Sequence, residues 1–210
     1  MQKLREPISS VTHFIGFLAA IPLLIWMVLA ASGPVGRTGA LVFGLSLMGL
    51  YGASALYHAV PGPGRLVAVL RRIDHIMIFV LIAGTYTPVC LVALPYPQGR
   101  LILTLIWCCA VGGLCLKLFW MNAPRWLYTL VYVVMGWIVV LAFGTLKQSL
   151  PVAGLYWLIA GGVVYTLGAV IYGLQPKFLD LKVWNSHDIF HLFVLGGSLC
   201  HIVFVLGYVL

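Results

Sequence analysis

The chain has 210 residues, of which 63% are hydrophobic and only 8% are charged. In a soluble domain about a quarter of the residues are charged. This composition therefore excludes a soluble fold and indicates an integral membrane protein. The formal net charge of +8 comes from basic residues that stand singly or in pairs at the ends of apolar segments. This pattern is typical of topology determinants and lipid-headgroup contacts, and it argues against nucleic-acid binding.

Seven apolar segments are each close to the roughly 20 residues that a membrane-spanning helix needs. The predicted helices cover about 8–31, 38–59, 72–93, 100–119, 125–145, 153–174 and 185–209. The breaks between them are short and rich in Gly and Pro, which leaves no room for a second domain. The sequence therefore predicts one all-α, seven-helix membrane domain over residues 1–210. In the third segment, Gly84 and Pro88 are compatible with a kink or with ordinary packing.

The basic residues divide unequally between the two ends of the predicted bundle. One end carries Lys3, Arg5, Arg65, Arg71, Arg72, Lys117, Arg125, Lys177 and Lys182, and the other carries Arg37, Arg100 and Lys147. Because basic residues are retained on the cytoplasmic side, this asymmetry predicts a cytoplasmic N-terminus. After seven spans, the C-terminus then lies outside.

Polar residues that are costly to bury in hydrocarbon occur at matching ends of three segments. His187 and His191 are four residues apart and share a helix face, and Ser54 and His58 have the same spacing. Asp74 stands at the start of the third segment. In the predicted orientation all of these residues lie within a turn or two of the cytoplasmic interface. The sequence therefore predicts one site in the cytoplasmic leaflet.

The residue types at this site indicate a metal. Three neutral imidazoles, from His58, His187 and His191, leave a fourth position open, as in catalytic zinc sites. Zinc suits imidazole, and iron or manganese are alternatives. A water activated by such a metal could lose its proton to Asp74 as general base, while Ser54 binds the water or steadies an oxyanion. The competing interpretation is that the histidines only hydrogen-bond across helices.

A second line of polar residues lies on the first helix. Glu6, Ser9 and His13 are spaced by three and four residues, which places them on one face at the same end of the bundle. We interpret them as residues that orient the metal ligands; the alternative is that Glu6 and His13 simply pair. By contrast, His201 lies 14 residues beyond His187, about 20 Å deeper in a helix, so it cannot join the same site.

Five motifs in this order carry a family resemblance. They are Glu6-Pro-Ile-Ser-Ser-Val-Thr-His13, Ser54-Ala-Leu-Tyr-His58, Arg71-Arg-Ile-Asp74-His, Ala83-Gly-Thr-Tyr-Thr-Pro88 and Ser186-His-Asp-Ile-Phe-His191. With them the chain resembles, over nearly its whole length, the bacterial hemolysin III family, within the group of progestin and adiponectin receptors (PAQR) and alkaline ceramidases. The resemblance implies zinc on the three histidines, with Ser54 and Asp74 contacting the zinc-bound water. It also implies a multi-pass protein of the bacterial inner (plasma) membrane. Ser9 departs from the pattern, because many relatives carry Asn there.

Three functional hypotheses follow. The leading one is a zinc-dependent hydrolase of a lipid amide, or less favourably an ester, with membrane lipids as partners and substrate source. The second is a non-catalytic zinc-stabilised sensor or receptor in membrane homeostasis. The third is a pore-forming haemolysin, which would need a polar stripe through several helices, whereas the polar residues here gather at one end. The sequence does not indicate an oligomeric state.

Overall fold

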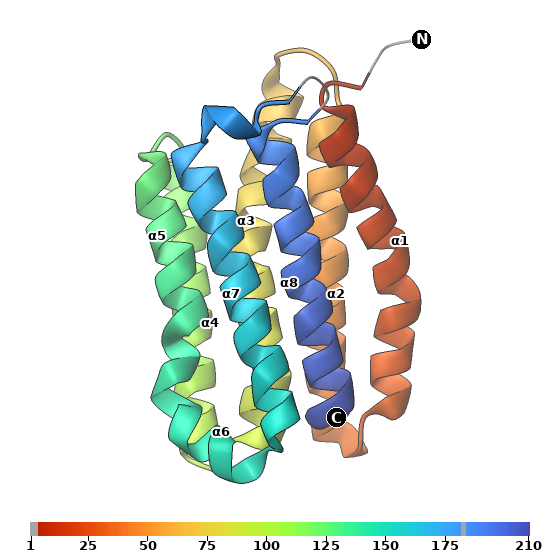
Figure 1. The fold of residues 1–210 in the computed structure, drawn as a ribbon, viewed down its shortest axis with the longest axis vertical. Coiled ribbons are helices and arrows are strands. Elements are labelled where there is room, and N and C mark those ends of the chain that lie inside the picture. Colours follow the sequence, from red (N-terminus) through yellow and green to blue (C-terminus); the bar gives the residue numbers. More distant parts are fainter. Residues whose placement is uncertain (1–3, 182–183) are drawn as a thin grey trace.

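The computed structural model describes residues 4–181 and 184–210, which form a bundle of long, roughly antiparallel helices (Figure 1). The membrane-length elements are α1 (Pro7–Ala30), α2 (Gly33–Ala59), α3 (Arg65–Pro88) with η1 (Val89–Ala93), α4 (Gln98–Phe119), α5 (Arg125–Gly136) with η2 (Trp137–Ala142) and α6 (Phe143–Ser149), α7 (Val152–Leu174) and α8 (Ser186–Tyr208). A short turn, η3 (Lys177–Leu179), precedes α8. Seven stretches are long and apolar enough to cross a membrane. The predicted all-α, seven-span fold is therefore confirmed.

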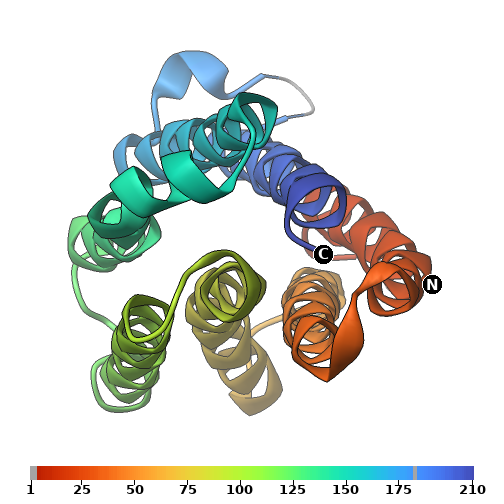
Figure 2. The ribbon, with the colours of Figure 1, turned by 90° about the horizontal axis from the view of Figure 1, so that it is seen from below.

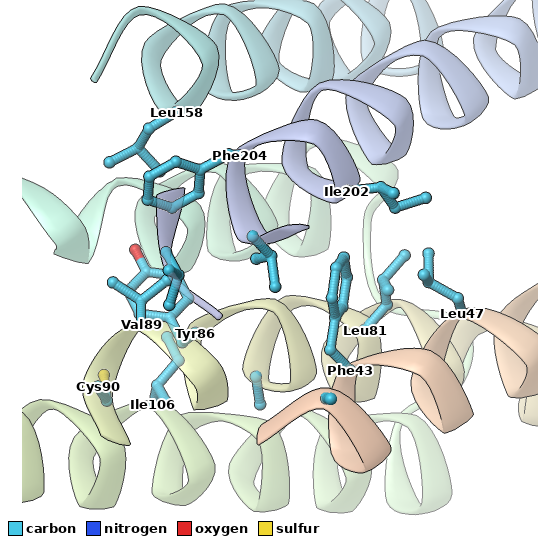
Figure 3. Packing of buried hydrophobic residues seen from close by; sticks show 14 of the residues in the cluster. Phe43, Leu47, Leu81, Tyr86, Val89, Cys90, Ile106, Leu158, Ile202 and Phe204 are labelled. Atoms are coloured by element: carbon cyan, nitrogen blue, oxygen red, sulfur yellow. The ribbon is translucent and has the colours of Figure 1, made fainter. Parts of the chain in front are cut away.

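The helices follow one another around the bundle in chain order, and α8 returns beside α1 (Figure 2). The closest neighbours are α1 with α2, α2 with α3, and α7 with α8. Apolar side chains such as Phe43, Leu81, Ile106 and Phe204 fill the interior between α2, α3, α4 and α8 (Figure 3). Large apolar side chains also cover the outer surface, as expected for helices that face lipid.

Two spans begin earlier than predicted. We placed their starts at 38 and 72, whereas α2 begins at Gly33 and α3 at Arg65. Pro34 lies in the first turn of α2, where its fixed φ favours helix. Gly64, with a φ of 158°, ends the loop before α3. Most residues from 65 to 72 are exposed; hydropathy marks the part of a helix inside lipid, and it misses a helical extension beyond it.

The fifth span is not the continuous helix that we predicted over 125–145. It changes from α-helix to a 3-10 stretch, η2, and returns to α-helix in α6, which ends at Ser149. The Tyr86 hydroxyl of α3 causes the break: it donates to the carbonyl of Gly136 at 2.6 Å and accepts from the Val139 N–H at 2.7 Å. A side chain inserted into the backbone hydrogen-bond ladder is a known cause of helix irregularity.

For the third segment, the sequence left open whether Gly84 and Pro88 produce a kink or have an ordinary packing role. The structure gives the two residues different roles. Gly84 has a packing role, because a Cβ there would meet the side chain of Ser46 and lie 3.4 Å from the Val42 carbonyl oxygen. Pro88 lacks a backbone N–H, and the wider π-helical turn η1 begins at the next residue. The close approach at Gly84 packs α3 against α2, the helices that carry Asp74 and His58.

Lys117 does not contact lipid headgroups as the sequence pattern predicted. Its side chain is fully buried at the end of α4, and its Nζ lies 3.3 Å from the centre of the Tyr128 ring on α5. The face of an aromatic ring attracts a cation. Lys117 therefore joins α4 to α5 inside the protein.

The orientation of the bundle stays a prediction. Among the described residues, the end at which α1 begins in Figure 1 carries Arg5, Arg65, Arg71, Arg72, Lys117, Arg125 and Lys177, and the opposite end carries Arg37, Arg100 and Lys147. Lys3 and Lys182, counted in the prediction, lie outside the described residues. A reporter that is active only in the cytoplasm should work when fused to the N-terminus and fail at the C-terminus. The reverse activity pattern would show that the polar end faces outward.

Candidate metal centre

Three histidines from two helices converge at the polar end of the bundle. His58 is the penultimate residue of α2, and His187 and His191 lie on successive turns at the start of α8. The Nε2 atom of His187 lies 3.4 Å from that of His58 and 3.2 Å from that of His191. One ligand nitrogen from each ring lies within 4.8 Å of the others. This group can hold a metal ion.

These separations fit the donor geometry of a small tetrahedral ion. With Zn–N bonds of about 2.0–2.1 Å, tetrahedral zinc places its nitrogen ligands roughly 3.3–3.4 Å apart, close to the two Nε2 separations here. His58 and His191 are 1% and 2% exposed, so water does not solvate these rings. Imidazole nitrogens favour zinc, copper, iron and nickel over magnesium or calcium. The donor set therefore fits a transition metal.

Glu6 fixes the ring of His58. The Nδ1 of His58 donates to Oε2 of Glu6 at 2.6 Å, since a carboxylate can only accept. This bond leaves the lone pair of the neutral ring on Nε2, the atom that faces His187. The hydrogen bond from His58 lowers the pKa of Glu6 to about 2. Glu6 thus contacts His58, a candidate metal ligand, and does not pair with His13, the alternative that the sequence left open.

The other two residues of the first-helix line contact α8. The rings of His13 and His191 lie 3.9 Å apart between centroids. Ser9 donates from Oγ to Oδ1 of Asp188 at 2.6 Å. The other oxygen of Asp188 accepts from the backbone N–H of Asn185, which completes a capping box at the start of α8. Ser9 therefore fixes the first turn of the helix that carries His187 and His191.

Asp74 and Ser54 border the same cavity as the histidines. A cavity of about 440 Å³ is lined at its polar end by Glu6, Ser54, Asp74, His187 and His191. Asp74 and Ser54 are 8% and 1% exposed. The structure thus brings these two residues to the histidine group, as predicted, while their catalytic roles stay predictions. Oδ2 of Asp74 also lies 3.8 Å from Nδ1 of the neighbouring His75.

The cavity becomes apolar away from this end. Ile78, Ile82 and Val194 line it next, and Trp137 and His201 border both it and a second, more apolar cavity of about 280 Å³. His201 donates from Nδ1 to the carbonyl of Gly197 at 2.8 Å and is absent from the metal-binding group. A long apolar chain is the kind of ligand that such a lining favours.

Sequence reasoning missed the basic and aromatic residues around the cavity. Arg71 and Arg125, which we took only as topology determinants, line it together with Tyr57 and Tyr172. For Arg71 a signal was present, because it precedes Asp74 by three residues and so shares its helix face. No comparable signal marks Arg125, whose place depends on how α5 packs against α7.

We expect about one transition-metal ion per chain in purified protein, measured by elemental analysis. The double change His187→Ala with His191→Ala removes two of three donors and should abolish binding. His201→Ala is the matched control and should retain the metal. Since a bound ion stabilises the folded state by mass action, a chelator should lower the melting temperature of the wild type and leave the double variant unaffected. Full metal content in the double variant would disprove the ligand assignment.

Replacing Glu6 with Gln should weaken metal affinity by about 10- to 100-fold, the usual effect of losing a partner that orients a ligand. The amide keeps the size of the side chain and loses the negative charge that favours a donating His58 Nδ1. Competition against a chromophoric chelator measures the affinity. Ser10→Ala is the control, because Ser10 holds α1 to α2 through the Ala55 carbonyl without contacting a histidine ligand. Equal losses in the two variants would mean that Glu6 acts only through helix packing.

Comparison with known proteins agrees with the motifs described above. The chain is 38% identical over 209 residues to Hemolysin-3 of Bacillus cereus, and the match covers 98% of this chain and 92% of that protein. It is 37% identical over 208 residues to the Hemolysin-3 homolog of Bacillus subtilis (strain 168), and this match covers 97% of this chain and 94% of that protein. A local match to the ADIPOR-like receptor IZH2 of Saccharomyces cerevisiae has 40% identity over 53 residues and covers 23% of this chain and 17% of that protein.

The local match fits the wider relationship to the progestin and adiponectin receptors. The seven apolar helices and the bacterial relatives support a multi-pass bacterial membrane protein. Residues 1–202 match the family described as Haemolysin-III related. The chain therefore belongs to the haemolysin III family.

Proposed function

We propose that the protein is a zinc-dependent hydrolase of a lipid amide, with its site in the cytoplasmic leaflet. The observation that carries the proposal is the position of Asp74 and Ser54 beside three convergent imidazoles, at one end of a cavity that becomes apolar further in. A purely structural ion needs neither a neighbouring carboxylate nor a cavity at its side. Three protein ligands also leave one position for water or substrate, the usual arrangement of catalytic zinc.

Each side chain at the polar end has a role in amide hydrolysis. The zinc, when bound, supplies an activated water and polarises the substrate carbonyl. Asp74 accepts the proton of the attacking water as the C–O bond forms, and it then delivers that proton to the amine nitrogen as the C–N bond breaks. The Ser54 hydroxyl donates to the negative charge that develops on the carbonyl oxygen. The apolar part of the cavity takes the acyl chain.

The non-catalytic sensor remains the second proposal, and one observation favours it. The metal ligands come from α2 and α8, and Glu6 adds the start of α1 through its bond to His58. An ion at this place would tie together the first, second and last spans. In a sensor, the ion would set the spacing of these helices, and lipid in the cavity would change that spacing without being cleaved.

The change Asp74→Asn separates the two proposals. The amide keeps the shape of the side chain but cannot take a proton, so turnover should fall by about 10²-fold or more, the typical effect of a placed general base. Metal content should stay at the wild-type value, because Asp74 is outside the three-histidine group. The measurement is release of fatty acid from a panel of N-acylated lipids in nanodiscs, with metal content determined on the same samples.

Two controls make this assay decisive. Ser54→Ala should reduce turnover while leaving the general base in place, and chelation should abolish turnover in the wild type. If no lipid in the panel is cleaved in a metal-dependent way, or if Asp74→Asn cleaves at the wild-type rate, the sensor proposal replaces the hydrolase.

A further inference from the structure

Two arginines stand at the outer end of the metal-site cavity. Arg71 begins the cavity-lining face of α3, which continues through Asp74, His75 and Ile78 at helical spacings of three and four residues. Arg125 is the first residue of α5 and also lines the cavity. Arg72 follows Arg71 directly, about 100° further around the helix, and is not among the lining residues. Arg71 therefore differs in direction from its basic neighbour Arg72.

None of the acidic side chains forms an ion pair with Arg71 or Arg125 in the described part of the chain. The sequence contains four acidic residues, and the five residues outside the described ranges include none of them. Glu6 pairs with His58 and Arg5, Asp180 accepts from Ser186, and Asp188 accepts from Ser9 and Asn185. Asp74 faces His75. Neither Arg71 nor Arg125 forms a side-chain hydrogen bond or ion pair with any residue that the structure describes.

The protein surrounding the arginines adds further positive charge. The guanidinium carbon of Arg125 lies 5.6 Å from the centre of the Tyr172 ring, and the Tyr172 hydroxyl lies 3.3 Å from that of Tyr128. The buried Lys117 ammonium lies over the Tyr128 ring. Among the described residues, that ammonium has no hydrogen-bond partner. A negatively charged ligand group at this end of the cavity would thus lie near cations that have no ion-pair partner among the described residues.

The position of the arginines relative to the metal site sets the shape of that ligand. Arg71 precedes Asp74 by three residues on one helix, which corresponds to about 4.5 Å along the axis at ~1.5 Å per residue. In a substrate whose amide lies beside Asp74, the acyl chain extends into the apolar part of the cavity. A group bonded near the amide nitrogen, on the other side from the acyl chain, would then lie at the arginines. Guanidinium groups bind phosphate and carboxylate through paired N–H donors.

We propose that the substrate is an N-acylated amine that carries an oxyanion, phosphate or carboxylate, close to the amide nitrogen, and that Arg71 and Arg125 bind this group. The inference rests on the proposed hydrolase for the position of the amide. The arginines select the headgroup, the zinc end holds the amide, and the apolar cavity holds the acyl chain. Neutral N-acyl lipids of the same chain length bind more weakly, because they leave both cations without a counter-charge.

The test is a binding titration of the zinc-loaded, full-length protein in nanodiscs of zwitterionic phosphatidylcholine. The probes are N-palmitoylethanolamine, its phosphate ester, N-palmitoylglycine and inorganic phosphate, and tryptophan fluorescence reports occupancy because Trp137 lines the cavity. The two charged lipids should bind at least about tenfold more tightly than the neutral one, the effect of one or two charge-assisted hydrogen bonds. Inorganic phosphate should bind far more weakly than the phosphate ester, which identifies the source as a lipid headgroup.

Variants assign the preference to particular residues. Arg71→Gln and Arg125→Gln should each reduce the preference for charged lipids and leave the affinity for the neutral lipid unchanged, whereas Arg72→Gln should keep the wild-type preference. Equal affinity for charged and neutral lipids in the wild type would overturn the inference. So would an equal loss in Arg72→Gln and Arg71→Gln, because the arginines would then act as general contacts to the bilayer.

Failure of this inference can be distinguished from failure of the hydrolase. The titration measures binding alone. When it is repeated with the Asp74→Asn variant, the amide of the lipid probe stays uncleaved during the measurement. Charge preference without turnover in the wild type would retain the headgroup site and reject hydrolysis. Turnover of neutral and charged lipids alike, without a difference in affinity, would retain hydrolysis and reject the headgroup site.

Discussion

The hydrogen bond between His58 and Glu6 is the contact on which the polar end of the molecule depends. It is short, at 2.6 Å, and it involves a carboxylate, so it is stronger than a bond between neutral groups. A backbone bond from the Glu6 N–H to the His58 carbonyl accompanies it. Together they hold the start of α1 against the end of α2. They also determine which nitrogen of His58 faces the two histidines of α8.

The bundle separates its stabilising and functional parts along its length. Buried apolar residues such as Phe43, Phe79 and Phe204 fill the interior, and the histidine group occupies the end where α2 finishes and α8 begins. In hydrocarbon, polar groups are kept only where they find partners. Some side chains at this end find partners in one another, as with Ser9 and Asp188 or Tyr172 and His75. Among the described residues, both ring nitrogens of His13 and Nδ1 of His191 have no hydrogen-bond partner. An ion and a ligand would complete the same network.

How much of this could be predicted depends on whether a feature is local in sequence. The seven spans follow from hydropathy, and the approach of His187 to His191 follows from helical spacing. Depth in the membrane added His58 and Asp74 to the same site. The contact between Glu6 and His58 depends on how α1 crosses α2, which periodicity does not specify, so the sequence left a pairing with His13 open. The break in the fifth span depends on Tyr86, which lies 53 residues from Val139 in the chain. Helix length was underestimated for α3 because its first two turns extend beyond the apolar run.

The separation of the three candidate metal ligands along the chain has a consequence for biosynthesis. His58 and His187 are 129 residues apart, and two of the three donors lie at the start of the last span. A chain released by the ribosome before residue 187 lacks both, whatever it has already inserted into the bilayer. The same holds for the Ser9–Asp188 bond, whose partners are 179 residues apart. A truncated product therefore lacks both the complete three-histidine group and the Ser9–Asp188 bond that links the first helix to the last.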